Sequence, residues 1–174
     1  KINSEIAEIK DLKIYISHHN FFDKESLKIK KIKISNANFF FNRENFEFLE
    51  LIFEKNFPHK NISIEKSKLF FNDKNNQTIF IYSILNSNFR KNDKDKLNIF
   101  STVGEIFNIP IKFEWEENII DKKITSKIDV SKVSINFLNK KIFKSSGIHY
   151  ENFLSILNND FKTKYSISKN SVTF

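Results

Sequence analysis

Side chains that carry chemistry in proteins are sparse in this sequence and are not spaced for a reaction. The 174 residues include no Cys, which excludes thiolate nucleophiles, disulfides and Cys-held metal sites. Two of the four His, His18 and His19, are adjacent, and no His pair has the H-x-x-x-H spacing of a zinc site. Gly104 and Gly147 are the only glycines, so a Gly-rich phosphate loop cannot form. We therefore expect no metal, no cofactor and no nucleotide site.

One acidic cluster surrounds the only tryptophan. Glu114, Glu116 and Glu117 flank Trp115, and paired carboxylates beside an aromatic ring would suit a site that binds or cleaves a sugar. The sequence around them alternates between apolar and polar residues, which places Glu114 and Glu116 on the solvated face of a strand. We therefore expect that the protein is not an enzyme.

The composition and net charge narrow the classes of partner. The net charge is +8, from 29 basic and 21 acidic residues, and a basic surface can indicate nucleic acid. Lys, Ile, Asn and Phe are abundant and all use A/T-rich codons, so an A/T-rich genome explains much of the lysine excess. Only Arg43 and Arg90 could make bidentate contacts with phosphate or guanine. We expect no nucleic-acid partner, although a Lys-rich nucleic-acid binder stays an alternative, and a membrane surface stays open because lysine attracts anionic headgroups.

Strand-type alternation runs through most of the chain and predicts a mainly β fold in one domain, 1–174. From Ile109 to Trp115 every second residue is apolar, which is the period of a strand with one dry and one wet face. The same period recurs at 12–16, 27–29, 32–34, 124–130 and 133–137. Short polar connections favour antiparallel neighbours. We expect one curved antiparallel sheet, forming an open groove or a half-barrel.

Two segments have helical spacing and predict about two amphipathic helices packed on this sheet. Residues 44–56 follow Asn42, a suitable N-cap, and place Phe46, Leu49 and Phe53 on one face. Residues 150–161 place five apolar side chains at i, i+3, i+4, i+7 and i+11, namely Tyr150, Phe153, Leu154, Leu157 and Phe161.

A similar ten-residue strand follows each predicted helix, at 62–71 and 165–174. This predicts repeated helix-strand units at 44–71 and 150–174, and a third similar strand at 32–41 has no helix before it. In each strand a small polar pair interrupts the alternation, which predicts a bulge or bend. These pairs are Ser35-Asn36, Lys66-Ser67 and Lys169-Asn170.

These patterns resemble the AsmA-like proteins, which belong with TamB to the bacterial bridge-type lipid-transfer group. The resemblance rests on the helix-strand unit, on the Asn/Ser bend followed by Phe-Phe, and on successive strands that run from Glu105 to Lys140. It spans most of the chain through patterns rather than invariant motifs. It implies a periplasmic sheet that curls into an apolar groove, without catalytic residues. Family members are several times longer and anchored, so the resemblance also implies a fragment of a longer chain, anchored in the inner membrane by a segment outside it.

The function implied by the resemblance is a non-catalytic, periplasmic lipid-binding or lipid-transfer module in outer-membrane biogenesis. Its partner would be a phospholipid or another acyl-chain lipid. Strands with one apolar face independently fit this role, because a lipid tail gains about 0.8 kcal/mol per CH₂ removed from water and needs no directional chemistry. The candidate groove residues are Ile109, Ile111, Phe113, Trp115, Ile124, Ile128, Val130, Val133, Ile135 and Phe137. The alternative is a closed β-sandwich that serves as a scaffold or adhesion module without a ligand.

Overall fold

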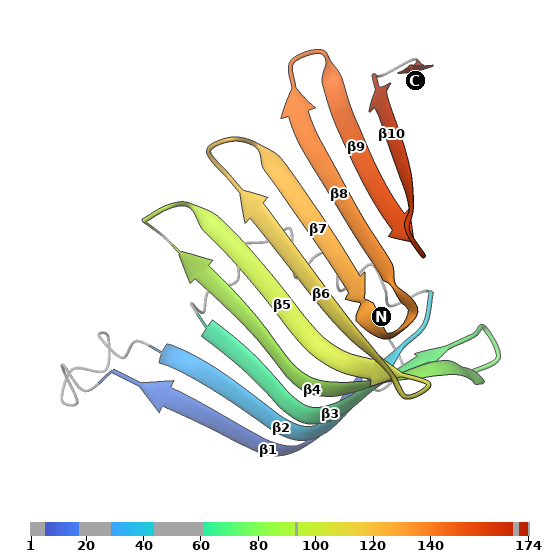
Figure 1. The fold of residues 1–174 in the computed structure, drawn as a ribbon. Helices are drawn as coiled ribbons and strands as arrows, with labels where there is room; N and C mark the ends of the chain where they lie inside the picture. Colours follow the sequence, from blue (N-terminus) through green and yellow to red (C-terminus); the bar gives the residue numbers. More distant parts are fainter. Residues whose placement is uncertain (1–5, 18–28, 44–60, 93, 169–170, 174) are drawn as a thin grey trace. The chain divides into compact units, whose positions relative to one another are not determined.

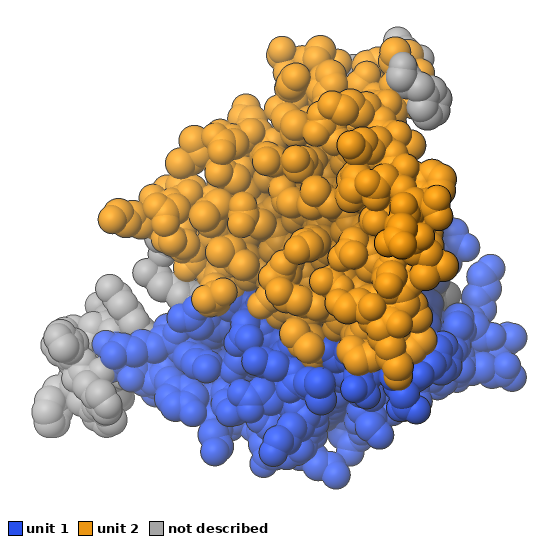
Figure 2. Space-filling view, viewed as in Figure 1, with its two compact units in different colours: residues 1–89, 104–108 blue, residues 90–103, 109–174 orange. Residues whose placement is uncertain are grey.

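The computed structural model describes residues 6–17, 29–43, 61–92, 94–168 and 171–173 (Figure 1). In these residues eleven strands form one open, mostly antiparallel sheet, and their spatial order follows the sequence from β1 to β11. The prediction of a mainly β fold is therefore confirmed. The chain divides into two compact units (Figure 2), which are unit 1, Lys1–Phe89 with Gly104–Asn108, and unit 2, Arg90–Val103 with Ile109–Phe174.

The strands differ in how they are shared between the units. Unit 1 contains β1 (Ala7–Ile16), β2 (Ile29–Phe41), β3 (Asn61–Asn72) and most of β4 (Thr78–Asn92). Unit 2 contains most of β5 (Leu97–Ile106) and all of β6 (Ile109–Asn118), β7 (Lys123–Val130), β8 (Ile135–Lys144), β9 (Gly147–Ile156), β10 (Asn159–Ile167) and β11 (Val172–Thr173). A single 3-10 turn, Ser131–Val133, joins β7 to β8.

The prediction of a helix at 150–161 is wrong. This segment forms most of β9, a two-residue turn at Leu157-Asn158 and the start of β10. Leu154 and Phe161 pair directly across the hairpin. Apolar residues of two strands on either side of the turn therefore have the same spacing in the sequence as one face of a helix. Aromatic and β-branched residues favour the strand. The other predicted helix, 44–56, lies outside the described residues, which contain no α-helix and so none long and apolar enough to span a membrane.

The second predicted repeat unit, 150–174, also differs from the expectation at its end. Instead of one kinked strand, β10 turns back into β11, and Ser166 pairs with Thr173 in an antiparallel hairpin. The Ser168 N–H donates to the Ser171 carbonyl at 2.9 Å, which closes the turn. The polar pair Lys169-Asn170 lies outside the described residues.

The similarity between 32–41 and 62–71 has a direct structural meaning in unit 1. These segments belong to β2 and β3, which pair in parallel with similar residues opposite one another, such as Ile34 with Ile64 and Phe41 with Phe71. Adjacent to the last pair, the rings of Phe40 and Phe70 stack with their centroids 5.2 Å apart. The repeated sequence therefore places residues of the same type opposite one another in β2 and β3.

The predicted interruption of β2 and β3 is confirmed at two of its three positions. Asn36 and Lys66 have positive φ values of 54° and 48°, and the β2–β3 pairing is interrupted around them. The hydroxyl of Ser67 spans this gap, because it accepts a hydrogen bond from the Ala37 N–H at 3.0 Å and donates to the Glu65 carbonyl at 2.8 Å. A small polar residue is needed there since both Ala37 and Ser67 are buried.

Turns with left-handed residues connect the strands, although glycine is almost absent. The hairpin turns Phe107-Asn108 in unit 1 and Leu157-Asn158 in unit 2 have positive φ at both positions, as type I′ turns require. Such turns match the right-handed twist of the flanking strands, but they strain side chains as large as Phe and Leu.

Candidate apolar binding face

One face of the sheet in unit 2 carries a continuous row of apolar side chains. Directly paired residues of neighbouring antiparallel strands project to the same face, and the register of β6 to β10 can therefore be followed across the strands. The row consists of Phe113, Ile128, Phe137, Leu154 and Phe161, one from each strand. We call the face that carries this row the apolar face of unit 2.

Further apolar rows on the same face lie two residues away along each strand on one side and four residues away on the other. Toward the β7–β8 turn, Val130 pairs with Ile135, which pairs with Ile156. Toward the other end, Tyr150 pairs with Tyr165, and their rings stack with centroids 4.8 Å apart. Apolar rows therefore lie on both sides of the central row.

Nine of the ten candidate groove residues lie on this face. In β6, Ile109 and Ile111 share it with Phe113 and Trp115 by the alternation of the strand, and the β7 and β8 candidates share it by register. The tenth, Val133, lies in the 3-10 turn and is 37% exposed. The left-handed backbone of Ser134, with a φ of 51°, interrupts the strand there, so alternation does not place Val133 on the face.

Sequence reasoning missed the contribution of β9 and β10 to this face. The helical spacing predicts Tyr150, Leu154 and Phe161 on one face of a helix over 150–161, a range that also includes Ile156. The signal that could have found them is the alternation of apolar side chains through β9, from Ile148 to Ile156, which a helical spacing of the larger residues obscured.

A row of polar side chains crosses the apolar face between its apolar rows. Trp115 pairs with Ser126, and the row continues through Asn139, Asn152 and Thr163. Asn139 Nδ2 donates to Asn152 Oδ1 at 2.6 Å, and Asn152 Nδ2 donates to Thr163 Oγ1 at 3.1 Å. These hydrogen bonds link the side chains of three strands, so the row divides the face into two apolar bands.

Exposure distinguishes this face from a protein core. The described hydrophobic residues that are buried, Ala37, Phe41, Ile84 and Phe89, all belong to unit 1. In the described part of unit 2 no hydrophobic side chain is buried. The nine candidates on the apolar face are half-buried, and Phe161 at the end of the central row is 56% exposed.

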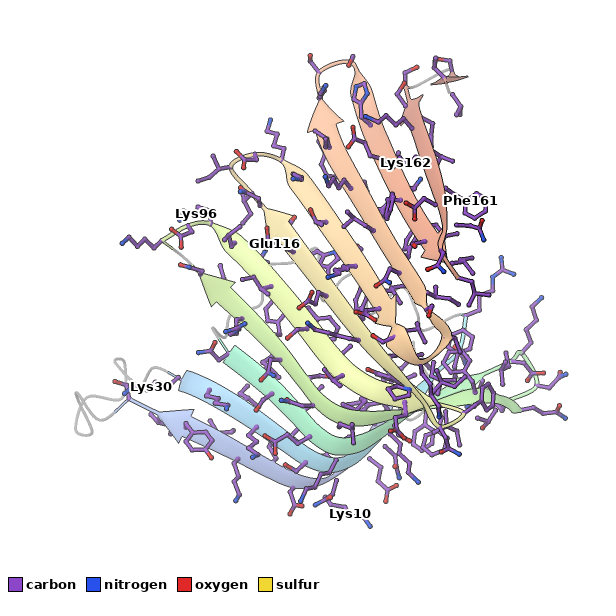
Figure 3. All side chains as sticks on the ribbon, viewed as in Figure 1. Lys10, Lys30, Lys96, Glu116, Phe161 and Lys162 are labelled. Atoms are coloured by element: carbon purple, nitrogen blue, oxygen red, sulfur yellow. The ribbon has the colours of Figure 1, made fainter. Side chains whose placement is uncertain are left out.

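The opposite face of unit 2 is charged. Glu114 lies opposite Lys127 of the neighbouring strand. Its carboxylate forms an ion pair with Lys112 Nζ at 2.9 Å. On β9, the Glu151 carboxylate accepts a hydrogen bond from Lys164 Nζ at 2.9 Å. This hydrogen bond holds the pKa of Glu151 below its ordinary value. Figure 3 labels Glu116, which belongs to the charged face. It also labels Phe161 and Lys162 of β10, which are adjacent in the strand and therefore belong to opposite faces.

The acidic residues around Trp115 do not converge. Glu114 and Glu116 belong to the charged face, whereas Glu117 lies on the apolar face and accepts a hydrogen bond from Asn98 Nδ2 at 2.7 Å. Among the described residues no three His, Asp or Glu side chains are grouped so that they could hold a metal ion. The arrangement offers an extended apolar surface rather than a reaction centre.

No family model, curated protein or solved structure matches the chain.

Proposed function

We propose that the protein is a non-catalytic lipid-binding module that shields acyl chains on the apolar face of unit 2. Its ligand is a phospholipid or another acyl-chain lipid. In line with the resemblance to the AsmA-like group, the proposal places the module in lipid transfer through the periplasm during outer-membrane biogenesis, within a longer chain that is anchored in the inner membrane.

The observation that carries the proposal is that the central apolar row is continuous across five strands and that its face is not buried. A sheet with one apolar face normally covers it with a second sheet or with helices. The described residues of unit 2 supply one sheet and no α-helix, and none of their hydrophobic side chains is buried. An apolar ligand would cover such a face and remove it from water.

The dimensions and chemistry of the face fit an acyl chain. The central row crosses five strands from Phe113 to Phe161, a span of about 19 Å at the usual strand spacing of about 4.8 Å. Each CH₂ that it removes from water contributes about 0.8 kcal/mol. The polar row through Asn139 and Asn152 runs beside this track, so it can bond to the polar part of a lipid whose tail lies on an apolar band.

The test is to ask whether lipid co-purifies with the chain and whether it depends on the apolar face. Native mass spectrometry would detect bound lipid, and solvent extraction would identify it. Phe113→Glu places a charge in the central row. The matched control is Leu138→Glu, which makes the same kind of change on the opposite face, where Leu138 pairs with Lys127 and Phe153.

We expect lipid on the native chain and on Leu138→Glu, and its loss from Phe113→Glu with strand circular dichroism and the cooperative melt retained. Unfolding of Phe113→Glu, but not of Leu138→Glu, would show that the face is a packed interior, contrary to the proposal. A lipid-free native chain that also takes up no added phospholipid would overturn lipid binding. If that chain were dimeric, the scaffold alternative would take its place.

A further inference from the structure

Two turns at the same end of unit 2 share one hydrogen-bonded frame. In the first, Asn92 Nδ2 donates to Asp95 Oδ2, and the Asp95 N–H donates back to Asn92 Oδ1. In the second, Asn118 Nδ2 donates to Asp121 Oδ2 at 2.8 Å, and the Asp121 N–H donates to Asn118 Oδ1 at 2.9 Å. A left-handed lysine ends each turn, Lys96 in the first and Lys122 in the second.

The residues between the Asn and the Asp of each frame are of opposite kinds in the sequence. Between Asn92 and Asp95 it has Asp93-Lys94, and between Asn118 and Asp121 it has Ile119-Ile120. Because the Asn and Asp side chains make the frame in both, the frame does not require apolar residues between them. Ile119 and Ile120 are nonetheless 43% and 67% exposed. Turns are usually polar, so the isoleucines need another explanation.

Backbone hydrogen bonds join the β6–β7 turn to neighbouring parts of the sheet end. The Ile119 N–H donates to the Lys96 carbonyl at 3.1 Å, and the Phe143 N–H donates to the Lys122 carbonyl at 2.9 Å. Ile119, Lys122, Lys123 and Phe143 also line one hollow beside the tip. The tip is thus bonded to the sheet end, and its apolar surface extends toward Phe143.

Lys122 and Lys123 line the hollow beside this tip, and Lys144 follows Phe143 in the chain. Lys122 and Lys144 make no ion pair within the described residues, and Lys96 lies at the same end of unit 2 (Figure 3). The nearby carboxylates of Asp121 and Glu117 accept hydrogen bonds from the amides of Asn118 and Asn98 rather than from a lysine. The tip therefore combines exposed apolar side chains with lysines, of which Lys122 and Lys144 make no ion pair within the described residues.

We propose that the β6–β7 turn is a docking site for the surface of an anionic phospholipid membrane, with Ile119 and Ile120 inserted among the lipids and Lys122, Lys123 and Lys144 against the phosphates. Apolar side chains rimmed by lysine are the combination that binds such surfaces. This site is separate from the lipid-binding face proposed above, and it would dock the module whether or not that face holds an acyl chain.

The sister turn supplies the sharpest variant. Ile119→Asp combined with Ile120→Lys gives the tip the Asp-Lys sequence of the first turn, keeps the frame and leaves the net charge unchanged. Co-sedimentation with vesicles of phosphatidylcholine and phosphatidylglycerol in equal parts measures binding. We expect at least a tenfold loss, on the order of the burial free energy of one isoleucine. The control, Leu157→Asp, changes a 65% exposed apolar tip at the other end of β9 and should bind as the native chain does.

Two further measurements separate charge from insertion. Lys122→Gln and Lys144→Gln should each weaken binding roughly fivefold, and phosphatidylcholine vesicles alone should bind weakly. Since the chain has no Cys, Ile120→Cys gives a single site for a polarity-sensitive fluorophore, whose emission should shift to the blue on mixed vesicles. The same label at Leu157→Cys should not shift.

Native-level vesicle binding by the Asp-Lys variant would overturn the proposal, as would an unshifted label at position 120. Dimerisation of the native chain that the Asp-Lys variant abolishes would show that the tip docks on a second copy instead. Vesicle binding that persists while native mass spectrometry finds no lipid would refute the lipid-binding face alone.

Discussion

Asn36 of β2 and Lys66 of β3 occupy the same level of two parallel strands, and both have a left-handed backbone, with φ values of 54° and 48°. Two neighbouring strands thus bend together, and their pairing is interrupted at that level. The Ser67 hydroxyl replaces the missing backbone partner of the Ala37 N–H at 3.0 Å. One side chain therefore satisfies the backbone where the two strands bend.

Ser67→Ala should destabilise the chain. Without the hydroxyl, the N–H of the fully buried Ala37 has no acceptor, and an unsatisfied buried donor costs about 1–3 kcal/mol. Chemical denaturation followed by circular dichroism would measure the free energy of unfolding.

Ser63 provides the matched control for this prediction. It lies on the same strand and is buried as deeply, but its hydroxyl has no hydrogen-bond partner among the described residues. Ser63→Ala should therefore leave the free energy of unfolding unchanged or raise it. Equal losses for both substitutions would show that the Ser67 hydrogen bond is not the source of the effect.

Leu157→Gly should stabilise the chain by up to about 1 kcal/mol. Leu157 has a φ of 48° and is 65% exposed, so glycine would relieve backbone strain while removing little packing. Lys127→Gly, in the middle of β7, should instead cost about 0.5–1 kcal/mol. Thermal melts of the two variants should move in opposite directions, and a lower melting temperature for Leu157→Gly would contradict the argument.

The pH dependence of unit 1 should include the Lys33–Glu65 ion pair. The hydrogen bond from Lys33, at 2.8 Å, holds the pKa of Glu65 below its ordinary value. A depressed carboxyl pKa contributes stability that is present above the ordinary value and is lost as the pH falls through the folded value. Carbon NMR titration should show that Lys33→Met raises the pKa of Glu65. The pKa of Glu151, which depends on Lys164, should not change, and a shift in both would indicate a general rearrangement.

Gly104→Ala should destabilise unit 1 through a steric clash. A Cβ at this position would lie 2.3 Å from the Ser83 carbonyl oxygen and 2.6 Å from the ring of Tyr82. Overpacking of this kind costs about 1–3 kcal/mol, and Tyr82→Leu should restore only part of it because the backbone oxygen stays. Val103→Ala, at a 41% exposed neighbour, is the comparison, and it should cost less than Gly104→Ala in the same denaturation experiment.

Alternation predicted the strands of this fold because a half-buried strand repeats every two residues, as from Ile109 to Trp115 in β6. It could not identify β9 and β10, since Leu154 and Phe161 are partners across a hairpin and also fit a helical stripe. The likeness of β2 and β3 was visible in the sequence, but likeness contains no information on pairing or direction. Their parallel register depends on contacts between strands.

The candidate face was predictable as far as the register stays regular. Phe113, Ile128 and Phe137 share a face because no bulge shifts the pairing of β6, β7 and β8. Val133 could not be placed, since the turn at 131–134 breaks the period. The polar row through Asn139 and Asn152 could not be predicted from the sequence either, because its members come together only when four strands align.

The left-handed turn residues have an evolutionary consequence. Ten described non-glycine residues have a positive φ, among them four Asn and three Lys, while the whole chain has only two glycines. At Phe107 and Leu157, glycine would adopt the same backbone conformation without strain. Directed evolution of this chain for thermal tolerance should therefore enrich glycine at such turns before it alters the interior.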